Sequence, residues 1–218
     1  MKEKRKDLTP PYARYLVRLT RPFPDFDFSF IKPLRQKAVE LLHLKQGDRV
    51  LDVGCGMGGS FPYLVDVVGP SGEVVGVEIS PEVTINTRRR IEKNEWRNVQ
   101  VMEASAQTVN LTGIFDGVLM FAAQDVFVSQ EVLENILPHL RTNARVVVFG
   151  AKTSRNRLGW ILNPFLRTAF SRLSFPTTPR PDYEPWRMLA KFVEKLDIEE
   201  YFFGWMFLAS GSVVTRKG

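Results

Sequence analysis

Cysteine and histidine are scarce in this sequence. Its 218 residues contain one cysteine, Cys55, and two histidines, His43 and His139. A single cysteine excludes an intrachain disulfide framework and fits a reducing compartment such as the cytoplasm. So few sulfur and imidazole ligands cannot form a zinc-type cluster, and we therefore expect no metal site.

Long hydrophobic runs are missing as well. No stretch reaches the roughly 18 apolar residues that a membrane-spanning helix needs, so the sequence predicts no transmembrane helix. The first seven residues are rich in charge and no apolar segment follows them, which is unlike a secretory signal. We therefore expect a cytoplasmic protein.

The excess of charge is modest: 30 basic and 24 acidic residues give a net charge of +6. Nucleic acid, an anionic membrane surface or acidic substrates could each explain it, as could ordinary surface solvation. Hydrophobic residues make up 44% of the chain, an ordinary value for a globular protein. The length suits one well-packed domain better than two.

The most informative stretch is residues 50–59, VLDVGCGMGG, an apolar strand that breaks into a glycine-rich turn. Glycine lets the backbone adopt positive φ and approach a ligand closely. About 20 residues later, a second apolar strand at 74–77 ends in Glu78. A glycine turn after one strand and an acid at the tip of the next predict an adenosine-containing cofactor, with the carboxylate on the ribose. The spacing of Gly54, Gly56 and Gly59 also satisfies G-x-G-x-x-G, which leaves a dinucleotide open.

Residues 51–58, LDVGCGMG, resemble the first signature motif of class I, Rossmann-like S-adenosylmethionine-dependent methyltransferases. An acid inside the strand belongs to that motif, and a carboxylate favours the cationic groups of S-adenosylmethionine over a pyrophosphate. The resemblance implies S-adenosylmethionine as cofactor. The residues of this turn that it places on the cofactor are Asp52, Gly54, Cys55, Gly56 and Gly58.

Three further stretches resemble later motifs of the same family. Residues 74–81 resemble the second motif, which implies Glu78 on the ribose and Ile79 against the adenine. Ser105 stands where the family commonly has an Asp near the adenine, and Ala106 follows it. Residues 115–121 resemble the fourth strand, whose end at Phe121 faces the transferred methyl group.

Alternating strands and helices predict an α/β fold, a doubly wound, mostly parallel seven-stranded sheet with a C-terminal antiparallel hairpin. Thr142-Asn143-Ala144 replace the usual Pro-Gly-Gly turn before the fifth strand. The expected strands are 50–53, 74–77, 99–102, 117–121, 145–149, 198–203 and 207–215. The expected helices are 30–44, 61–68, 81–93, 131–140 and 186–196.

Two segments lie outside this pattern and are expected to form the acceptor site. They are an N-terminal cap at 1–30 and an insertion at 152–186, both within or beside a single methyltransferase domain at 31–218. The insertion carries an apolar stripe flanked by arginines, which suits either a lid or a peripheral membrane contact. Both segments are aromatic and poor in acids, which favours an apolar small molecule or lipid-like acceptor. The whole is loosely similar to the ubiquinone/menaquinone-biosynthesis and phospholipid N-methyltransferase groups.

Nucleic acid is the less favoured acceptor, because residues 121–124, FAAQ, lack the Asn/Asp-Pro-Pro-aromatic motif of many amino-methylating enzymes. No residue stands in a motif that fixes a catalytic role, and both histidines fit surface or capping positions. The weak catalytic candidates are Tyr12, Tyr15, Gln124, Asp125 and Tyr183. Two other classes of function stay open: a nicotinamide-dependent oxidoreductase and a catalytically silent S-adenosylmethionine-binding module. The sequence does not predict an oligomeric state.

Overall fold

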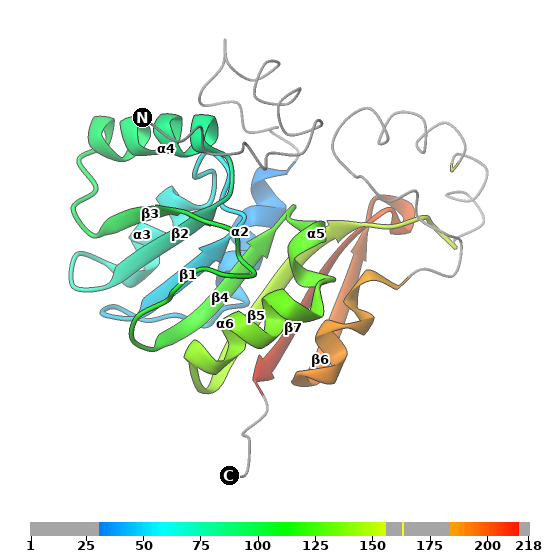
Figure 1. Cartoon of the computed structure of the whole chain (residues 1–218). Helices are drawn as coiled ribbons and strands as arrows, with labels where there is room; N and C mark the ends of the chain where they lie inside the picture. The colour runs from blue at the N-terminus through cyan, green and yellow to red at the C-terminus, as the bar shows by residue number, and fades with distance from the viewer. Residues whose placement is uncertain (1–30, 156–162, 164–183, 214–218) are drawn as a thin grey trace, which may run out of the picture.

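The described chain forms one sheet of seven strands, with β3 and β6 at its edges (Figure 1). The computed structural model describes residues 31–155, 163 and 184–213, and the strand order is β3-β2-β1-β4-β5-β7-β6. The strands are β1 Arg49–Val53, β2 Glu73–Glu78, β3 Val99–Glu103, β4 Phe115–Phe121, β5 Leu140–Ala151, β6 Val193–Tyr201 and β7 Met206–Val213. Strands β1 to β5 pair in parallel, whereas β7 pairs antiparallel with β5 and β6. The predicted fold class is confirmed.

Helices cover both faces of the sheet, as its strand pattern requires. They are α2 Lys32–Glu40, α3 Phe61–Val68, α4 Pro81–Lys93, α5 Gln124–Phe127 and α6 Gln130–Ile136, with short 3-10 turns η1 Leu137–His139, η2 Pro185–Arg187, η3 Leu189–Lys191 and η4 Phe202–Gly204. Neighbouring residues of β4 belong to opposite cores: Val118 lies in the same hydrophobic cluster as Leu133 of α6, and Leu119 in the same cluster as Leu64 of α3. Because both faces are buried, the central strands are apolar throughout rather than alternating. Figure 1 shows α5 and α6 over one face.

Parallel strands bring their carboxyl ends to one edge of the sheet. The turns after β1, β2, β3 and β4 therefore lie side by side there, and ligands of such sheets bind at that edge. Two hydrogen bonds fix this arrangement at the centre, because the N–H groups of Gly54 and Cys55 both donate to Val77 O, at 2.8 and 3.1 Å.

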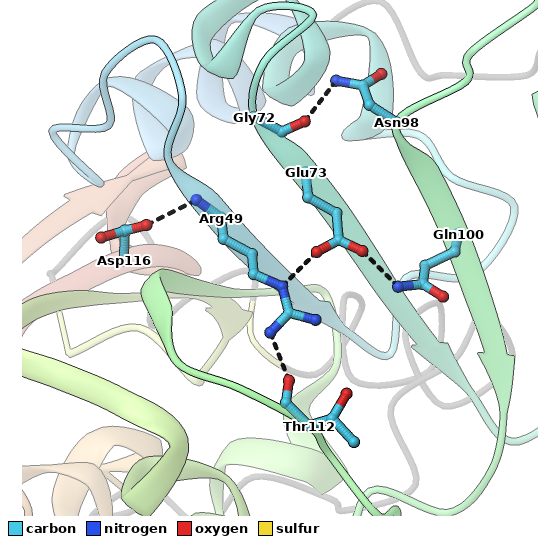
Figure 2. Close-up of polar contacts among 7 residues, drawn as sticks. All are labelled: Arg49, Gly72, Glu73, Asn98, Gln100, Thr112 and Asp116. Carbon is cyan, nitrogen blue, oxygen red and sulfur yellow. Dashed lines mark hydrogen bonds and ion pairs between the residues drawn. The ribbon is translucent and has the colours of Figure 1, made fainter.

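Polar contacts at the opposite, amino-terminal edge tie the strands together (Figure 2). The Arg49 side chain pairs with Glu73 and donates to Thr112 O, and its guanidinium lies 4.3 Å from the Phe115 ring centroid. Gln100 donates to the other Glu73 oxygen at 2.6 Å. These bonds join β1, β2, β3 and the loop before β4, so we assign this edge a structural role.

The helix predicted over residues 186–196 is wrong. Two 3-10 turns occupy its first half, and β6 begins at Val193 and pairs with β7 from Val193↔Val213 onward. The apolar spacing of this stretch fits a helix, but ladder hydrogen bonds to β7 decide its conformation. The pairing of β6 with β7 shifts register between Glu194 and Asp197, and Lys195 has a φ of 50° within this irregular stretch.

The turn expected at residues 141–145 is instead part of β5. Its pairing with β4 passes from Phe115↔Leu140 to Gly117↔Arg145, so the extra residues form an irregularity within the strand. Asn143 takes the left-handed conformation there, with φ at 61°, which asparagine tolerates better than most residues. The short helix α5 was not predicted, because four residues are too few to show a period.

The expected N-terminal cap at 1–30 lies outside the described residues, as does most of the insertion at 152–186. Within the described part of the insertion, the Asn163 side chain links the end of β5 to the turn before β7. Its Oδ1 accepts hydrogen bonds from Ser154 N at 3.1 Å and from Trp205 Nε1 at 2.9 Å. Within the described ranges no helix is long and apolar enough to cross a membrane, and no group of three metal-ligating side chains occurs.

Candidate functional site

The glycine turn after β1 has one open position and two packed ones. Gly54, Gly56 and Gly58 have φ values of 71°, 54° and 70°, a region that disfavours other residues. A Cβ on Gly54 would lie 2.6 Å from Ala123 Cβ, and one on Gly58 would lie 2.6 Å from the Phe61 ring. A Cβ on Gly56 would meet nothing within 4 Å. The turn therefore presents bare backbone to open space at Gly56.

Glu78 closes this turn from the neighbouring strand. Its Oε2 accepts from Gly56 N at 3.1 Å, and its Oε1 accepts from Ser80 N at 2.8 Å. Burial raises the pKa of the Glu78 carboxyl, these two N–H groups oppose the shift, and the charge of Asp125 adds to it. The structure thus brings the predicted acid against the predicted glycine loop.

Asp52 is the second acid beside the turn, and it is almost completely buried, with 1% of its surface exposed. Neither of its carboxyl oxygens has a hydrogen-bond partner among the described residues. Burial raises the pKa of Asp52 to about 7, against the lowering influence of the Arg35 guanidinium and the nearby Ser60 hydroxyl. A buried carboxylate without partners costs several kcal/mol, so a cationic ligand at this place would be stabilised by it.

The residues predicted to lie near the adenine follow the ends of β2 and β3, which are neighbouring strands. Ala104 N donates to Glu78 O at 3.0 Å, which holds the two strand ends side by side. Ile79, Ser105 and Ala106 are all half-buried there. The Ser105 hydroxyl already accepts a hydrogen bond from Gln107 N at 3.3 Å, so it is part of a local turn. Their assignment to the adenine stays a prediction.

Two predicted cofactor residues have side chains that pack inside the protein. The Cys55 thiol points to the place where a Cβ on Gly76 would lie, 2.8 Å away, and burial raises its pKa. Only the Cys55 backbone can therefore line the turn.

The Phe121 ring stacks on Phe149 with centroids 4.3 Å apart, and the Arg35 guanidinium lies 4.1 Å from the centroid of the Phe121 ring. The structure gives Phe121 a packing role.

Among the catalytic candidates, Gln124 and Asp125 are described, whereas Tyr12, Tyr15 and Tyr183 lie outside the described residues. Gln124 is 4% exposed, and its Oε1 accepts from Ala151 N at 3.1 Å, so it bridges the ends of β4 and β5. Its Nε2 has no partner among the described residues. Asp125 is exposed and close enough to influence Glu78.

The two histidines lie away from this site. His43 precedes β1 and His139 precedes β5, so both are at the amino-terminal edge of the sheet. This placement agrees with their interpretation as surface or capping residues.

The family model of protein-L-isoaspartate(D-aspartate) O-methyltransferase matches residues 31–147, which is more than half of the 218 residues. The chain belongs to this family. Its members are class I S-adenosylmethionine-dependent methyltransferases, so the predicted family and cofactor are confirmed. The looser likeness to the quinone and phospholipid methyltransferase groups is not confirmed, and the match gives no support to a nicotinamide-dependent oxidoreductase.

Individual proteins that this chain resembles differ in what their names say they act on. A protein-L-isoaspartate O-methyltransferase of Methanothrix thermoacetophila is 41% identical over 63 residues, 29% of this chain and 30% of the relative. One of Ignicoccus hospitalis is 27% identical over 151 residues, 68% of this chain and 69% of the relative. A 23S rRNA (uracil(1939)-C(5))-methyltransferase of Acinetobacter baumannii is 44% identical over 109 residues, 48% of this chain and 22% of the relative.

The chain therefore spans less than a third of the length of the first and the last of these relatives. The names of these relatives do not agree on an acceptor, since an aklanonic acid methyltransferase of Streptomyces is also 32% identical over 79 residues, 36% of this chain and 36% of the relative. Neither the expected apolar or lipid-like acceptor nor the expectation that nucleic acid is an unlikely partner is confirmed. The family match ends at residue 147, before the insertion. Family membership therefore supports S-adenosylmethionine as the cofactor, whereas it does not establish the acceptor.

Solved structures show the same fold. A S-adenosylmethionine-dependent methyltransferase of Aquifex aeolicus is 21% identical with a TM-score of 0.61, over 87% of this chain and 100% of that one. The N-methyltransferase NodS of Bradyrhizobium japonicum, in complex with S-adenosyl-L-homocysteine, is 11% identical with a TM-score of 0.64, over 94% and 99%. At these identities the likeness concerns the fold alone.

Sequence reasoning missed the helix side chains that contact the glycine turn and the residues next to it. Thr87 of α4 is fully buried, and its hydroxyl lies 2.8 Å from Gly56 O. Arg90, one turn later, donates to Met57 O at 3.2 Å. Arg35 of α2 donates to Ser60 Oγ at 2.8 Å beside Asp52. The sequence offered one signal for these residues, the polar Thr87 on the buried face of α4. Arg35 stands in no motif, so nothing in the sequence pointed to it.

Proposed function

We propose that this protein transfers the methyl group of S-adenosylmethionine to a carboxylate oxygen of its acceptor. The observation that carries the proposal is the bare backbone at Gly56 beside two acids, the buried Asp52 and the half-buried Glu78. Glu78 would accept from the ribose hydroxyls, because each of its two oxygens accepts one N–H group and keeps a second lone pair for a further hydrogen bond. Asp52 would meet the cationic amino-acid half, which satisfies two carboxyl oxygens that otherwise lack partners.

The cofactor supplies the reactivity, because its methyl group is attached to a positively charged sulfur. The protein has to hold the acceptor in line, about 3 Å from the methyl carbon, and exclude water. The turn after β4 lies beside the glycine loop, because Ala123 fills the space next to Gly54. Residues that follow Ala123 are therefore the described ones best placed to face an acceptor.

Gln124 supports an anionic oxygen as the acceptor. Its Oε1 is fixed by Ala151 N, which leaves the buried amide Nε2 as a donor without a partner among the described residues. A carboxylate oxygen accepts such a hydrogen bond and needs no general base, since it is already deprotonated at neutral pH. This agrees with the described part of the site, where neither histidine lies near the carboxyl ends of the strands. The isoaspartate methyltransferases among the relatives make a protein carboxylate the first acceptor to test.

The test uses the full chain, S-adenosylmethionine labelled in the methyl group, and four acceptors in parallel. They are an isoaspartyl peptide, the matched aspartyl peptide, ribosomal RNA and a lipid and quinone extract. We expect label in the isoaspartyl peptide and its release as volatile methanol at alkaline pH, because a methyl ester hydrolyses there whereas an N-methyl or C-methyl group does not. Alkali-stable label would refute the carboxylate acceptor.

The same assay separates the remaining alternatives. Label in the RNA or in the extract, and none in the peptide, would identify RNA or a small molecule as the acceptor and refute the carboxylate. Tight cofactor binding without transfer to any acceptor would favour the catalytically silent module. Failure to bind S-adenosylhomocysteine in titration calorimetry would refute the cofactor site itself.

A further inference from the structure

A hollow of about 520 Å³ lies at the amino-terminal edge of the sheet, between the segment that follows α3 and the segment that follows α4. Its volume is within the roughly 300–1,000 Å³ of small-molecule sites. It shares no lining residue with the glycine turn, which lies at the opposite edge of the sheet, so what binds here is independent of the proposed function. The charged, amide and aromatic residues of its lining are Gln46, Asp66, Glu95, Trp96, Arg97 and Asn98.

Hydrogen bonds and ring packing hold two walls of this hollow in place. Asn98 Nδ2 donates to Gly69 O at 2.8 Å and to Gly72 O at 3.0 Å, which ties the segment before β3 to the segment before β2; Figure 2 shows the bond to Gly72. Trp96 is half-buried, and its ring meets the Phe61 ring edge to face, with centroids 6.3 Å apart. The hollow is therefore part of the folded framework.

The turn that brings Trp96 to the hollow contains a residue type that its backbone disfavours. Helix α4 ends in a Schellman motif, in which Trp96 N donates to Ile91 O at 3.2 Å and Glu95 N donates to Glu92 O at 3.1 Å. Glu95 occupies the left-handed position of this motif, with φ at 55°, where glycine is usual. A side chain in this conformation is strained relative to glycine, and strain of this kind points to a function of the side chain.

Charges of both signs line the hollow, and they do not pair with one another. The carboxylates of Asp66 and Glu95 and the guanidinium of Arg97 form no ion pair or hydrogen bond within the described chain. Each of these groups can therefore hold an opposite charge of a ligand. Trp96 and Val65 add aromatic and aliphatic surface to the same lining.

We propose that this hollow binds a zwitterionic molecule of amino-acid or short-peptide size. The ammonium group of the ligand lies at the carboxylates of Asp66 and Glu95, and its carboxylate lies at the guanidinium of Arg97. Its apolar side chain packs against Trp96. A ligand with charge of one sign would leave part of this lining unmatched, and the two carboxylates would repel a polyanion such as a nucleotide.

The dipeptide alanylphenylalanine and two blocked forms of it test the two charges separately. In the full chain, isotope-labelled for NMR, the indole N–H signal of Trp96 reports binding; it is identified as the signal absent from Trp96→Phe, and the other tryptophans are internal controls. We expect the free dipeptide to shift the Trp96 signal in a saturable way. The N-acetyl form, which lacks the ammonium group, and the amide form, which lacks the carboxylate, should each bind about tenfold more weakly.

Variants assign each charge to its residue. Arg97→Gln should bind the free dipeptide about tenfold more weakly but the amide form as wild type does, because that contact is already missing. Glu95→Gln should weaken binding of the free dipeptide and not that of the N-acetyl form. Glu95→Gly should raise the melting temperature, because it relieves the left-handed strain, and yet weaken binding. Arg88→Gln removes an exposed charge of α4 outside the hollow, and this matched control should bind like wild type.

Four results would overturn the proposal. Equal affinity for all three forms of the dipeptide would mean an apolar contact alone. Equal weakening of the free and amide forms by Arg97→Gln would separate the ligand carboxylate from Arg97. Glu95→Gly that binds as tightly as wild type would refute the role of the Glu95 side chain, and a Trp96 signal that never moves would refute the site.

Circular dichroism checks the fold of each variant, and if one fails to fold, the three dipeptide forms on wild type still decide. None of these measurements involves S-adenosylmethionine. Failure to bind the dipeptide therefore leaves the proposed methyl transfer untouched, and failure of methyl transfer leaves this hollow untouched.

Discussion

Replacing glycines one at a time tests whether the open backbone at Gly56 faces the cofactor. At a φ of 54°, Gly56→Ala places its Cβ in space that no described atom within 4 Å occupies. The change therefore costs the protein only the strain of a left-handed alanine, about 1–2 kcal/mol. In a chain of this length that strain lowers the melting temperature by about 2–8 °C.

Gly47→Ala is the matched control for this strain. Gly47 also has a positive φ, at 88°, and its Cβ would come no closer than 3.7 Å to Ser71 Oγ, but it precedes β1 at the opposite edge of the sheet. Gly47→Ala should lose at least as much stability as Gly56→Ala in thermal unfolding, because its φ of 88° is less favourable for alanine than the 54° of Gly56. Gly54→Ala and Gly58→Ala should lose more, because their Cβ atoms would lie 2.6 Å from other side chains.

The two matched variants should differ in ligand binding. We expect Gly56→Ala to bind S-adenosylhomocysteine at least tenfold more weakly in calorimetry, since the added methyl group occupies ligand space and costs about 1.4 kcal/mol or more. Gly47→Ala should bind like wild type. Wild-type affinity in folded Gly56→Ala would refute the placement of the cofactor at this turn.

Three further predictions concern side chains of the cofactor half and of the insertion. Glu78→Gln should weaken cofactor binding by about 1–3 kcal/mol in calorimetry, while Glu73→Gln at the other end of β2 should leave it unchanged; equal effects would contradict the ribose assignment. Ser105→Asp should keep or tighten binding, because a carboxylate is a stronger acceptor and can still accept from Gln107 N, and a marked loss in folded protein would place Ser105 elsewhere. Exchanging the insertion's Arg167 and Arg172 for Glu should abolish co-sedimentation with anionic vesicles if the insertion contacts membranes, at about 1 kcal/mol for each arginine. Wild type that ignores such vesicles at low salt would refute that contact.

The cofactor half was predictable because its signals are local. A strand, a glycine turn and an acid follow one another between residues 50 and 78, and the structure places Glu78 against Gly56 as the motif implies. Helices α3 and α4 coincide with their predicted ranges, since each begins with proline near its first turn and has a clear break after it.

The remaining features depend on contacts between distant residues. Whether residues 193–197 form a helix or a strand is decided by pairing with β7, which no local pattern shows. Arg35 belongs to the site only because Gly59 and Phe121, 24 and 86 positions further on, leave room for it and contact it. The acceptor stays a proposal because the two segments expected to form its site, residues 1–30 and 152–186, lie outside the family match and largely outside the described residues.

The close packing of Ala123 against Gly54 limits how this enzyme's specificity can change. Position 123 immediately precedes Gln124, so it is an obvious target for reshaping the acceptor pocket by directed evolution. A larger side chain there would press on the backbone of the cofactor turn, because even a methyl group on Gly54 would come within 2.6 Å of it. Gains on the acceptor side would then be offset by losses of cofactor. Libraries should therefore keep alanine at 123 and vary the segments that the family match does not reach.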